Sequence, residues 1–341
     1  MRKKIGFVLA GIFLATLLTI TWTPAPVAAG PINLNYANFP PAPTFPCVQM
    51  ERWKQEVEKR TNGKVAIKTF PGGTLLKAKA MMDGVIAGQA DIGCLCMAYQ
   101  PGRFVITNAT TLPLNPPSAT VSSLVLWDLY KKYQPKAFGK VKVLTMFTTA
   151  PFNIMSKVPV RNLDDIKGLD LRAPGSAGVV LKNLGGNPVG MPMPQTPEAL
   201  QKGTVKGLIS SLEVMKDFKF AELCRYVTKI DVGVIPFAVV MNMDKWNSLP
   251  KDVQKVMEEL GPQQAVWTGV YMDTHVKESM AWSKKTHNIE VIELSKTEKA
   301  KWDKLLDPIT GKWITAAKAK GFPARAIVDD IVGFTKMYSG Q

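Results

Sequence analysis

The stretch EKRTNGKVAIKTFPGG, residues 58–73, contains the end of one element, the whole of the next and the turn after it. Asn62 and Gly63 form a helix stop signal, because both residues tolerate the left-handed backbone conformation in which many helices end. The residues KVAIKTF then have the pattern of a strand, and the Pro-Gly-Gly turn at 71–73 closes it. Helix, strand and turn therefore follow one another directly.

The same alternation extends to both sides of this stretch. The strand INLNYANF (32–39) and the helix CVQMERWKQEVEKRTNG (47–63) come before the strand KVAIKTF. A helix from about Leu75 to Ala87 and the strand ADIGCLC (90–96) come after it. Strands that alternate with helices in this way are typical of an α/β domain with a parallel sheet.

A second cycle of strands and helices lies further along the chain. Its elements are the strands KVKVLTMFT (140–148), GLDLRAP (168–174), NPVGM (187–191) and VKGLISS (205–211), with helices at about 176–184 and 196–202. The strand VGVIPFAVVMNM (232–243) would return the chain to the first sheet. Residues 251–287 have a helical pattern that Gly261-Pro262 interrupts, and more helix follows. We therefore predict an α/β clamshell: two lobes, interlobe crossing strands and long C-terminal helices.

The N-terminal residues have the pattern of a secretory signal peptide. Arg2, Lys3 and Lys4 precede an apolar run from Ile5 to about Trp22, and the small residues Val-Ala-Ala at 27–29 suit a signal peptidase. A membrane anchor is the alternative, but two prolines near the end of the run favour cleavage. The prediction for the whole chain is a signal peptide at 1–29, a first lobe of 30–149 plus about 238–277, and a second lobe of 150–237 plus about 278–341 with the C-terminal helices.

Composition and charge narrow the class of protein. The chain is 46% hydrophobic and 21% charged, which is ordinary for a globular protein, and its formal net charge is +16. The basic residues are scattered and an exported protein meets no genome, so we expect no nucleic-acid partner. The positive charge either attracts small anions or is simply a solvated lysine-rich surface.

The cysteines and histidines suggest neither a metal site nor a disulfide framework. Cys94 and Cys96 lie two residues apart in the apolar stretch DIGCLCMAY, where we expect both to be small buried side chains. His275 and His287 lie on a polar helical segment without the spacing of metal ligands. We therefore expect no metal and no cofactor.

Motifs of catalysis are also missing from the sequence. It contains no G-x-S-x-G, G-x-x-x-x-G-K-[ST] or H-E-x-x-H pattern. Ser210 and Ser211 have no histidine near them in the sequence. We therefore predict a protein that is not an enzyme, and an exported hydrolase that uses one of these serines is the alternative.

Arg172 stands at the end of a short strand pattern in GLDLRAPG, residues 168–175. Leu169 and Leu171 share one side of this strand, and Asp170 and Arg172 share the other. A guanidinium at this place is either a solvated surface group or an anion clamp. The residues of this stretch do not decide between the two.

Residues from about 38 to 250 resemble the periplasmic solute-binding subunit of TRAP (tripartite ATP-independent periplasmic) transporters, the DctP-like family. The resemblance lies in five segments, which are VEKRTNGKVAIKTFPGGTL, GVIAGQADIG, DDIKGLDLRAPGSAGVVLKNLGGNPVGM, EALQKGTVKGLI and WNSLPKDVQKVM. Their order and spacing match the family over about two thirds of the chain. The resemblance implies a periplasmic-binding-protein clamshell, periplasmic location, a small organic acid anion as solute and a membrane permease as partner. Some relatives dimerise through a long C-terminal helix, and the resemblance leaves a homodimer open here.

The resemblance also implies roles for individual residues. Arg172 matches the arginine that binds the solute's carboxylate, and Ser210 stands where an asparagine often contacts solute. Phe152 replaces a second arginine of many dicarboxylate binders, which favours an organic monocarboxylate with an apolar or aromatic body. Met193 matches a stacking aromatic residue. The remaining predicted contacts follow the ends of the first and third strands, at Asn38, Phe39, Tyr99 and Arg103.

We expect the mature protein to begin near Gly30, because signal peptidase cleaves after small residues such as those at 27–29. N-terminal sequencing of the exported protein tests this. A soluble form that retains Met1 would contradict export by a cleaved signal peptide.

Overall fold

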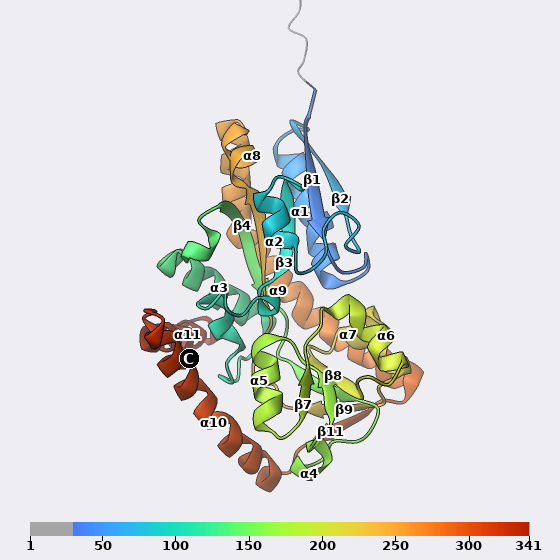
Figure 1. Cartoon of the computed structure of the whole chain (residues 1–341). Helices are drawn as coiled ribbons and strands as arrows, with labels where there is room; N and C mark the ends of the chain where they lie inside the picture. The colour runs from blue at the N-terminus through green and yellow to red at the C-terminus, as the bar shows by residue number, and fades with distance from the viewer. Residues whose placement is uncertain (1–29, 341) are drawn as a thin grey trace, which may run out of the picture. The chain divides into compact units, whose positions relative to one another are not determined.

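The fold is mixed α/β and consists of two separate sheets with helices packed around them (Figure 1). A computed structural model describes residues 30–340, which contain eleven α-helices and eleven strands. The predicted signal peptide lies outside these residues. In the part of the chain that is described, no helix combines the length and the apolar character that a membrane crossing requires.

The first sheet has five strands in the order β2-β1-β3-β10-β4. Their bounds are β1 Ile32–Asn38, β2 Val65–Phe70, β3 Ile92–Cys96, β4 Val141–Thr148 and β10 Pro236–Asn242. β1 lies parallel to β2 and β3, as the alternating pattern predicts. β10 is the predicted return strand, and it lies antiparallel between β3 and β4.

The second sheet has six strands in the order β11-β9-β5-β8-β6-β7. Their bounds are β5 Asn153–Ser156, β6 Asp170–Arg172, β7 Asn187–Val189, β8 Gly207–Ser210, β9 Tyr226–Lys229 and β11 Glu290–Glu293. The chain enters this sheet after β4, leaves it before β10 and returns through α9 to β11, so three crossings join the sheets. The predicted crossings between lobes are therefore present, and the first two are the short links 149–152 and 230–235 between strands of the two sheets.

The helices are α1 Phe45–Arg60, α2 Met81–Ile86, α3 Ala119–Tyr133, α4 Leu163–Ile166, α5 Gly175–Asn183, α6 Thr196–Gln201, α7 Val214–Asp217, α8 Met243–Ser248, α9 Lys251–His287, α10 Lys296–Ala319 and α11 Ala324–Ser339. The predicted helices have bounds close to those observed except for α2 and α9, whereas α3, α4, α7 and α8 were not predicted. The helix predicted from Leu75 is confined to α2. The sequence analysis missed α3, although Ser118 caps its N-terminus and Val125, Leu126 and Leu129 form a buried face.

The predicted interruption of the long helix at Gly261-Pro262 is wrong, because α9 is continuous from Lys251 to His287. Proline removes one hydrogen bond from the helix, but tertiary contacts hold the segment in place. The Thr145 hydroxyl donates a 2.8 Å hydrogen bond to the carbonyl oxygen of Gly261. Gly261 also lies so close to β4 that an added Cβ would be 2.5 Å from the Leu144 carbonyl oxygen.

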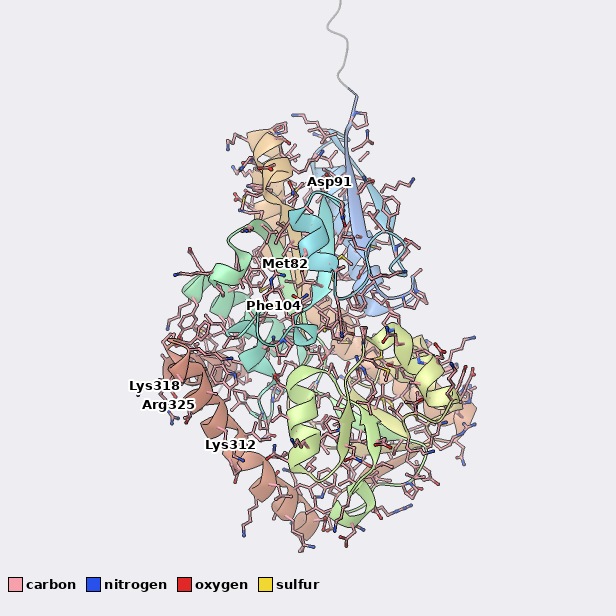
Figure 2. All side chains as sticks on the ribbon, viewed as in Figure 1. Met82, Asp91, Phe104, Lys312, Lys318 and Arg325 are labelled. Atoms are coloured by element: carbon pink, nitrogen blue, oxygen red, sulfur yellow. The ribbon has the colours of Figure 1, made fainter. Side chains whose placement is uncertain are left out.

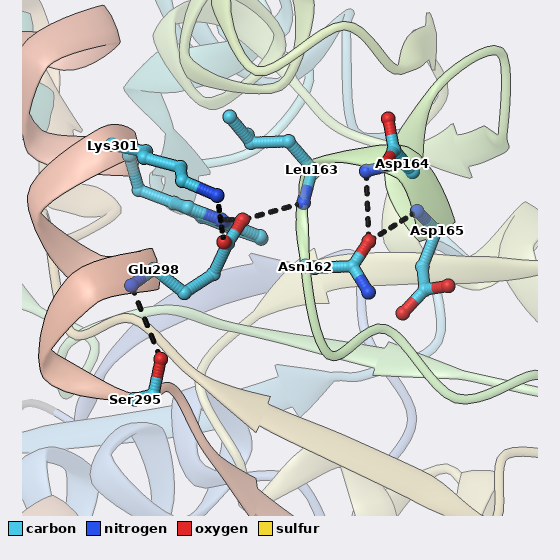
Figure 3. Close-up of polar contacts among 8 residues, drawn as sticks. Asn162, Leu163, Asp164, Asp165, Ser295, Glu298 and Lys301 are labelled. Carbon is cyan, nitrogen blue, oxygen red and sulfur yellow. Dashed lines mark hydrogen bonds and ion pairs between the residues drawn. The ribbon is translucent and has the colours of Figure 1, made fainter.

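The start of α10 is bound to the second sheet's lobe through Glu298 (Figure 3). Its Oε1 accepts a 2.8 Å hydrogen bond from the backbone N–H of Leu163, at the start of α4. Lys301 pairs with Oε2 at 3.1 Å, and the Ser295 hydroxyl caps the helix. The bond from Leu163 is the main reason that the pKa of Glu298 is lowered.

The following helix, α11, packs on the other side of the molecule, against α3. Asp330 accepts a 2.6 Å hydrogen bond from the Tyr133 hydroxyl and pairs with Lys132 at 2.7 Å. Tyr338 donates a hydrogen bond to Asp128 of the same helix. The C-terminal helices therefore contact structure around both sheets.

The core contains apolar side chains from both sheets in one cluster, with a second cluster on the second sheet. Met82 and Phe104, labelled in Figure 2, are buried in the first cluster, whereas Lys312, Lys318 and Arg325 on α10 and α11 are exposed. The four cysteines are all buried and unpaired, as expected for Cys94 and Cys96.

We expect Gly269→Ala to destabilise the fold by about 1–3 kcal/mol, because its Cβ would lie 2.5 Å from the Thr120 Cα, where α9 meets α3. The matched control is Gly311→Ala in α10, where an added Cβ meets no atom within 4 Å. Alanine should stabilise that position by about 0.5–1 kcal/mol. Urea unfolding of both variants measures the difference, and equal effects would contradict this account of the α3–α9 contact.

Candidate ligand-binding site

A cavity with about 470 Å³ of empty space lies between segments of the two sheets. Loops after β1 and β3, together with β10, supply one side of its wall. The ends of β6 and β8 and the helix α7 supply the other.

Aromatic side chains form much of the wall on the side of the first sheet. Phe39, Phe45 and Phe237 all line the cavity. The Phe39 and Phe237 rings stack with centroids 6.3 Å apart, and Phe45 meets Phe237 edge-on at 5.4 Å. Tyr99 packs edge-on against Phe39 at 5.7 Å. These contacts hold the rings as a rigid apolar surface.

Arg172 ends β6 and lines the cavity, yet it is only 2% exposed. Its Nε donates a 3.1 Å hydrogen bond to the Met191 carbonyl oxygen, and its Nη2 donates a 3.3 Å bond to the Tyr99 hydroxyl oxygen. That oxygen also accepts a 3.0 Å bond from the backbone N–H of Met193. Because Tyr99 accepts both bonds, its own O–H proton is used in neither.

No carboxylate of residues 30–340 forms an ion pair with Arg172. The arginines that do form such pairs are Arg60, Arg103 and Arg161. A guanidinium stays charged at any physiological pH, and removing it from water without a counter-charge is costly. The geometry therefore offers a preformed place for an anion.

The structure brings five of the eight predicted site residues together in the cavity wall. These are Phe39, Tyr99, Arg172, Met193 and Ser210. Phe152, Asn38 and Arg103 are not among the residues that line it.

Each of the other three side chains is engaged elsewhere. Phe152 is fully buried against Gly233, where its ring would lie 2.9 Å from an added Cβ, so it packs in the core. The Asn38 amide donates to the Pro46 carbonyl oxygen at 2.7 Å, which fixes the loop after β1. Arg103 pairs with Asp83 at 2.7 Å.

Sequence reasoning missed two acidic residues of the wall, Glu213 and Asp217. Glu213 is 2% exposed, and its Oε2 has no hydrogen-bond partner among the described residues. Asp217 Oδ1 lies 2.7 Å from Nε2 of His275 on α9, whereas its Oδ2 is also unpartnered. No local pattern marks these residues, because their burial depends on α7 packing against α9.

Glu213 and the neighbouring His275 have shifted pKa values. Burial raises the pKa of Glu213 from the usual 4.5 to about 7. The hydrogen bond to Asp217 raises the pKa of His275. Tyr271 also lies near these groups on α9, and Arg172 faces the same cavity. Glu213 is therefore largely protonated in mildly acidic solution.

The described residues contain no cluster of three or more acidic, histidine or cysteine side chains that could hold a metal ion. The one histidine near the cavity, His275, is bonded to Asp217 rather than to Ser210 or Ser211. A serine–histidine pair for nucleophilic chemistry is not formed by these residues.

Residues 40–316 match the family model described as bacterial extracellular solute-binding protein, family 7. The chain belongs to this family. Members of family 7 are solute-binding receptors, so this receptor class agrees with a cavity that presents an arginine and aromatic rings.

Three known proteins are similar to this family 7 receptor in sequence, and two of them also in solved structure. A TRAP periplasmic solute-binding protein of Desulfovibrio salexigens is 57% identical, with a TM-score of 0.81 over 91% of this chain and 97% of that one. A marine-metagenome TRAP protein specific for aromatic acids, solved with 3-hydroxybenzoate, is 27% identical, with a TM-score of 0.87 over 91% and 99%. The C4-dicarboxylate-binding protein DctB of Bacillus subtilis is 27% identical over 74% of each chain. The fold is therefore the two-lobed TRAP receptor fold, and the protein is a TRAP-type solute receptor.

We expect the ligand-free receptor to lose stability as pH rises from 4.5 to about 7 through Glu213. In that window the unfolded chain ionises this carboxyl and the folded chain does not, so rising pH favours unfolding. The raised pKa of His275 acts in the same direction. Glu213→Gln cannot ionise and should flatten the profile by up to about 3 kcal/mol. Urea unfolding across this pH range measures the difference.

The matched control is Glu222→Gln, because Glu222 is exposed. Its profile should follow that of the wild type. A Glu213→Gln profile parallel to the wild type would show that Glu213 ionises alike in the folded and unfolded chains.

Proposed function

We propose that this receptor binds an organic monocarboxylate with an apolar or aromatic body in the cavity at Arg172. It would deliver this solute to the membrane permease subunits of a TRAP transporter. It would act in the periplasm after cleavage of its signal peptide. In this proposal the protein is a receptor and not an enzyme, and the solute leaves it chemically unchanged.

The observation that carries the proposal is the buried guanidinium of Arg172 without a carboxylate partner. A solute carboxylate would supply the missing charge and accept two parallel hydrogen bonds from the planar fork. The unused O–H of Tyr99 lies beside it as a further donor. Exclusion of water from the cavity strengthens such a pair.

The remainder of the wall favours one carboxylate rather than two. Arg172 is the only basic residue among those that line the cavity, and Glu213 and Asp217 are acidic. A second solute carboxylate would meet these acids or the aromatic rings. The aromatic-acid specificity of the marine relative supports this choice over the C4-dicarboxylate specificity of DctB.

We also propose that the two lobes follow the boundaries predicted above and close on the solute. The membership of β4 and β10 in one sheet and of β5 to β9 in the other supports this division. The cavity takes side chains from both sets, and the hydrogen bond between Arg172 and Tyr99 already joins them, so the closed receptor would hold the solute between the two.

We expect Arg172→Ala to remove most of the affinity for benzoate and 3-hydroxybenzoate. Breaking a buried charge pair costs about 2–5 kcal/mol, which is about 30-fold or more in Kd. Arg172→Lys should recover little, because an ammonium cannot form the two parallel bonds. Isothermal titration calorimetry measures the affinities, and thermal shifts with excess ligand check them.

Arg103→Ala is the matched control, since this arginine pairs with Asp83 outside the cavity wall. Its affinities should equal those of the wild type. Undiminished binding by Arg172→Ala, or a loss shared equally by Arg103→Ala, would refute the proposed role of Arg172.

A further inference from the structure

Glu213 is the N-cap residue of α7, three residues after β8 ends at Ser210. It lines the same cavity as Arg172, together with Asp217 at the end of α7. The cavity wall therefore contains carboxyl groups in addition to the arginine. The proposed carboxylate clamp makes no use of them.

One oxygen of the Glu213 carboxyl group, Oε2, lacks a donor within residues 30–340. This oxygen is buried, and the side chain as a whole is 2% exposed. His275, the nearest basic group on α9, is engaged with Asp217 Oδ1 at 2.7 Å. An unsatisfied buried acceptor of this kind costs about 1–3 kcal/mol, so such groups in native proteins call for a partner.

A solute in the cavity can supply that partner. An anionic solute group would be repelled by Asp217 and by Glu213 where Glu213 is ionised, and an apolar group would leave Oε2 unpaired. A hydroxyl or an N–H group would donate to it. Burial is the main reason that the pKa of Glu213 is raised.

We propose that Glu213 forms a second polar subsite, which accepts a hydrogen bond from a hydroxyl or N–H donor on the body of the solute. The receptor would then select monocarboxylates that carry such a donor over otherwise identical acids that lack it. This inference rests on the proposed binding of a monocarboxylate at Arg172 and defines the class of solute further.

Matched pairs of acids test the subsite by calorimetry. The hydroxyl pairs are 3-hydroxybenzoate with benzoate and mandelate with phenylacetate, and the N–H pair is pyroglutamate with 3-oxocyclopentanecarboxylate. In at least one pair the wild type should prefer the donor-bearing acid by about 10- to 100-fold, the range expected for a hydrogen bond to a charged or buried acceptor. The pair that shows the preference identifies the donor as O–H or N–H.

Variants at Glu213 assign this preference to its carboxyl group. Glu213→Leu removes the acceptor and should bring the affinity ratio close to one, whereas Glu213→Gln keeps an acceptor oxygen and should retain part of the ratio. Glu222→Leu, at an exposed glutamate, should keep the wild-type ratio. If Glu213→Leu does not fold, the wild-type affinity ratios and those of Glu213→Gln still test whether the Glu213 carboxyl accepts a hydrogen bond from the solute.

The outcomes separate this inference from the proposed function. Wild-type ratios near one in all three pairs, with binding that depends on Arg172, would overturn the subsite and leave the carboxylate clamp intact. A ratio that survives in Glu213→Leu would also overturn it. Failure of every acid to bind, or binding that is indifferent to Arg172→Ala, would overturn the proposed function itself.

Discussion

A guanidinium cannot lose its proton under physiological conditions, so a chain that buries one must surround it with acceptors. Arg172 has two neutral oxygens for this purpose, the Met191 carbonyl and the Tyr99 hydroxyl. Met191 belongs to the region around the second sheet, whereas Tyr99 follows β3 of the first. The position of the arginine therefore depends on the contact between the two halves of the fold, and so does the shape of the cavity.

The charges around the cavity form a balanced set. Arg172 is positive, Asp217 is compensated by His275, and Glu213 is largely neutral in mildly acidic solution because its pKa is raised to about 7. The positive charge of Arg172 is then the one without compensation, and a single solute anion would neutralise it. The aromatic wall adds apolar surface without further charge. Electrostatics thus sets the number of charged groups on the solute, and the rings set the character of its body.

The sequence predicts all five strands of the first sheet, because each has its own local signal, but it misses β5, β9 and β11 of the second. Asn62-Gly63 ends α1, and the apolar stretch 236–242 is the strand that returns to the first sheet. Pro262 predicts an interruption of α9, and this prediction is wrong because contacts of Gly261 with Leu144 and Thr145 outweigh the effect of the proline on the helix. Arg172 was identified by its place at a strand end together with the family resemblance. Glu213 had no such signal, since its burial requires α9, whose His275 is 62 residues away in sequence. The side chain of Phe152 could point to the core or to the cavity, and only the packing of Gly233 decides this.

The three crossings between the sheets and the C-terminal helices have a consequence for how the molecule unfolds. Residues 31–341 form one compact unit, and one apolar cluster contains Ile154 and Ile209 of the second sheet with Phe237 and Val239 of the first. If the two lobes separated, this apolar cluster would be exposed and the contact between α11 and α3 would be lost. Heat should therefore melt the two lobes in a single cooperative transition, although the sheets have separate hydrogen-bond networks.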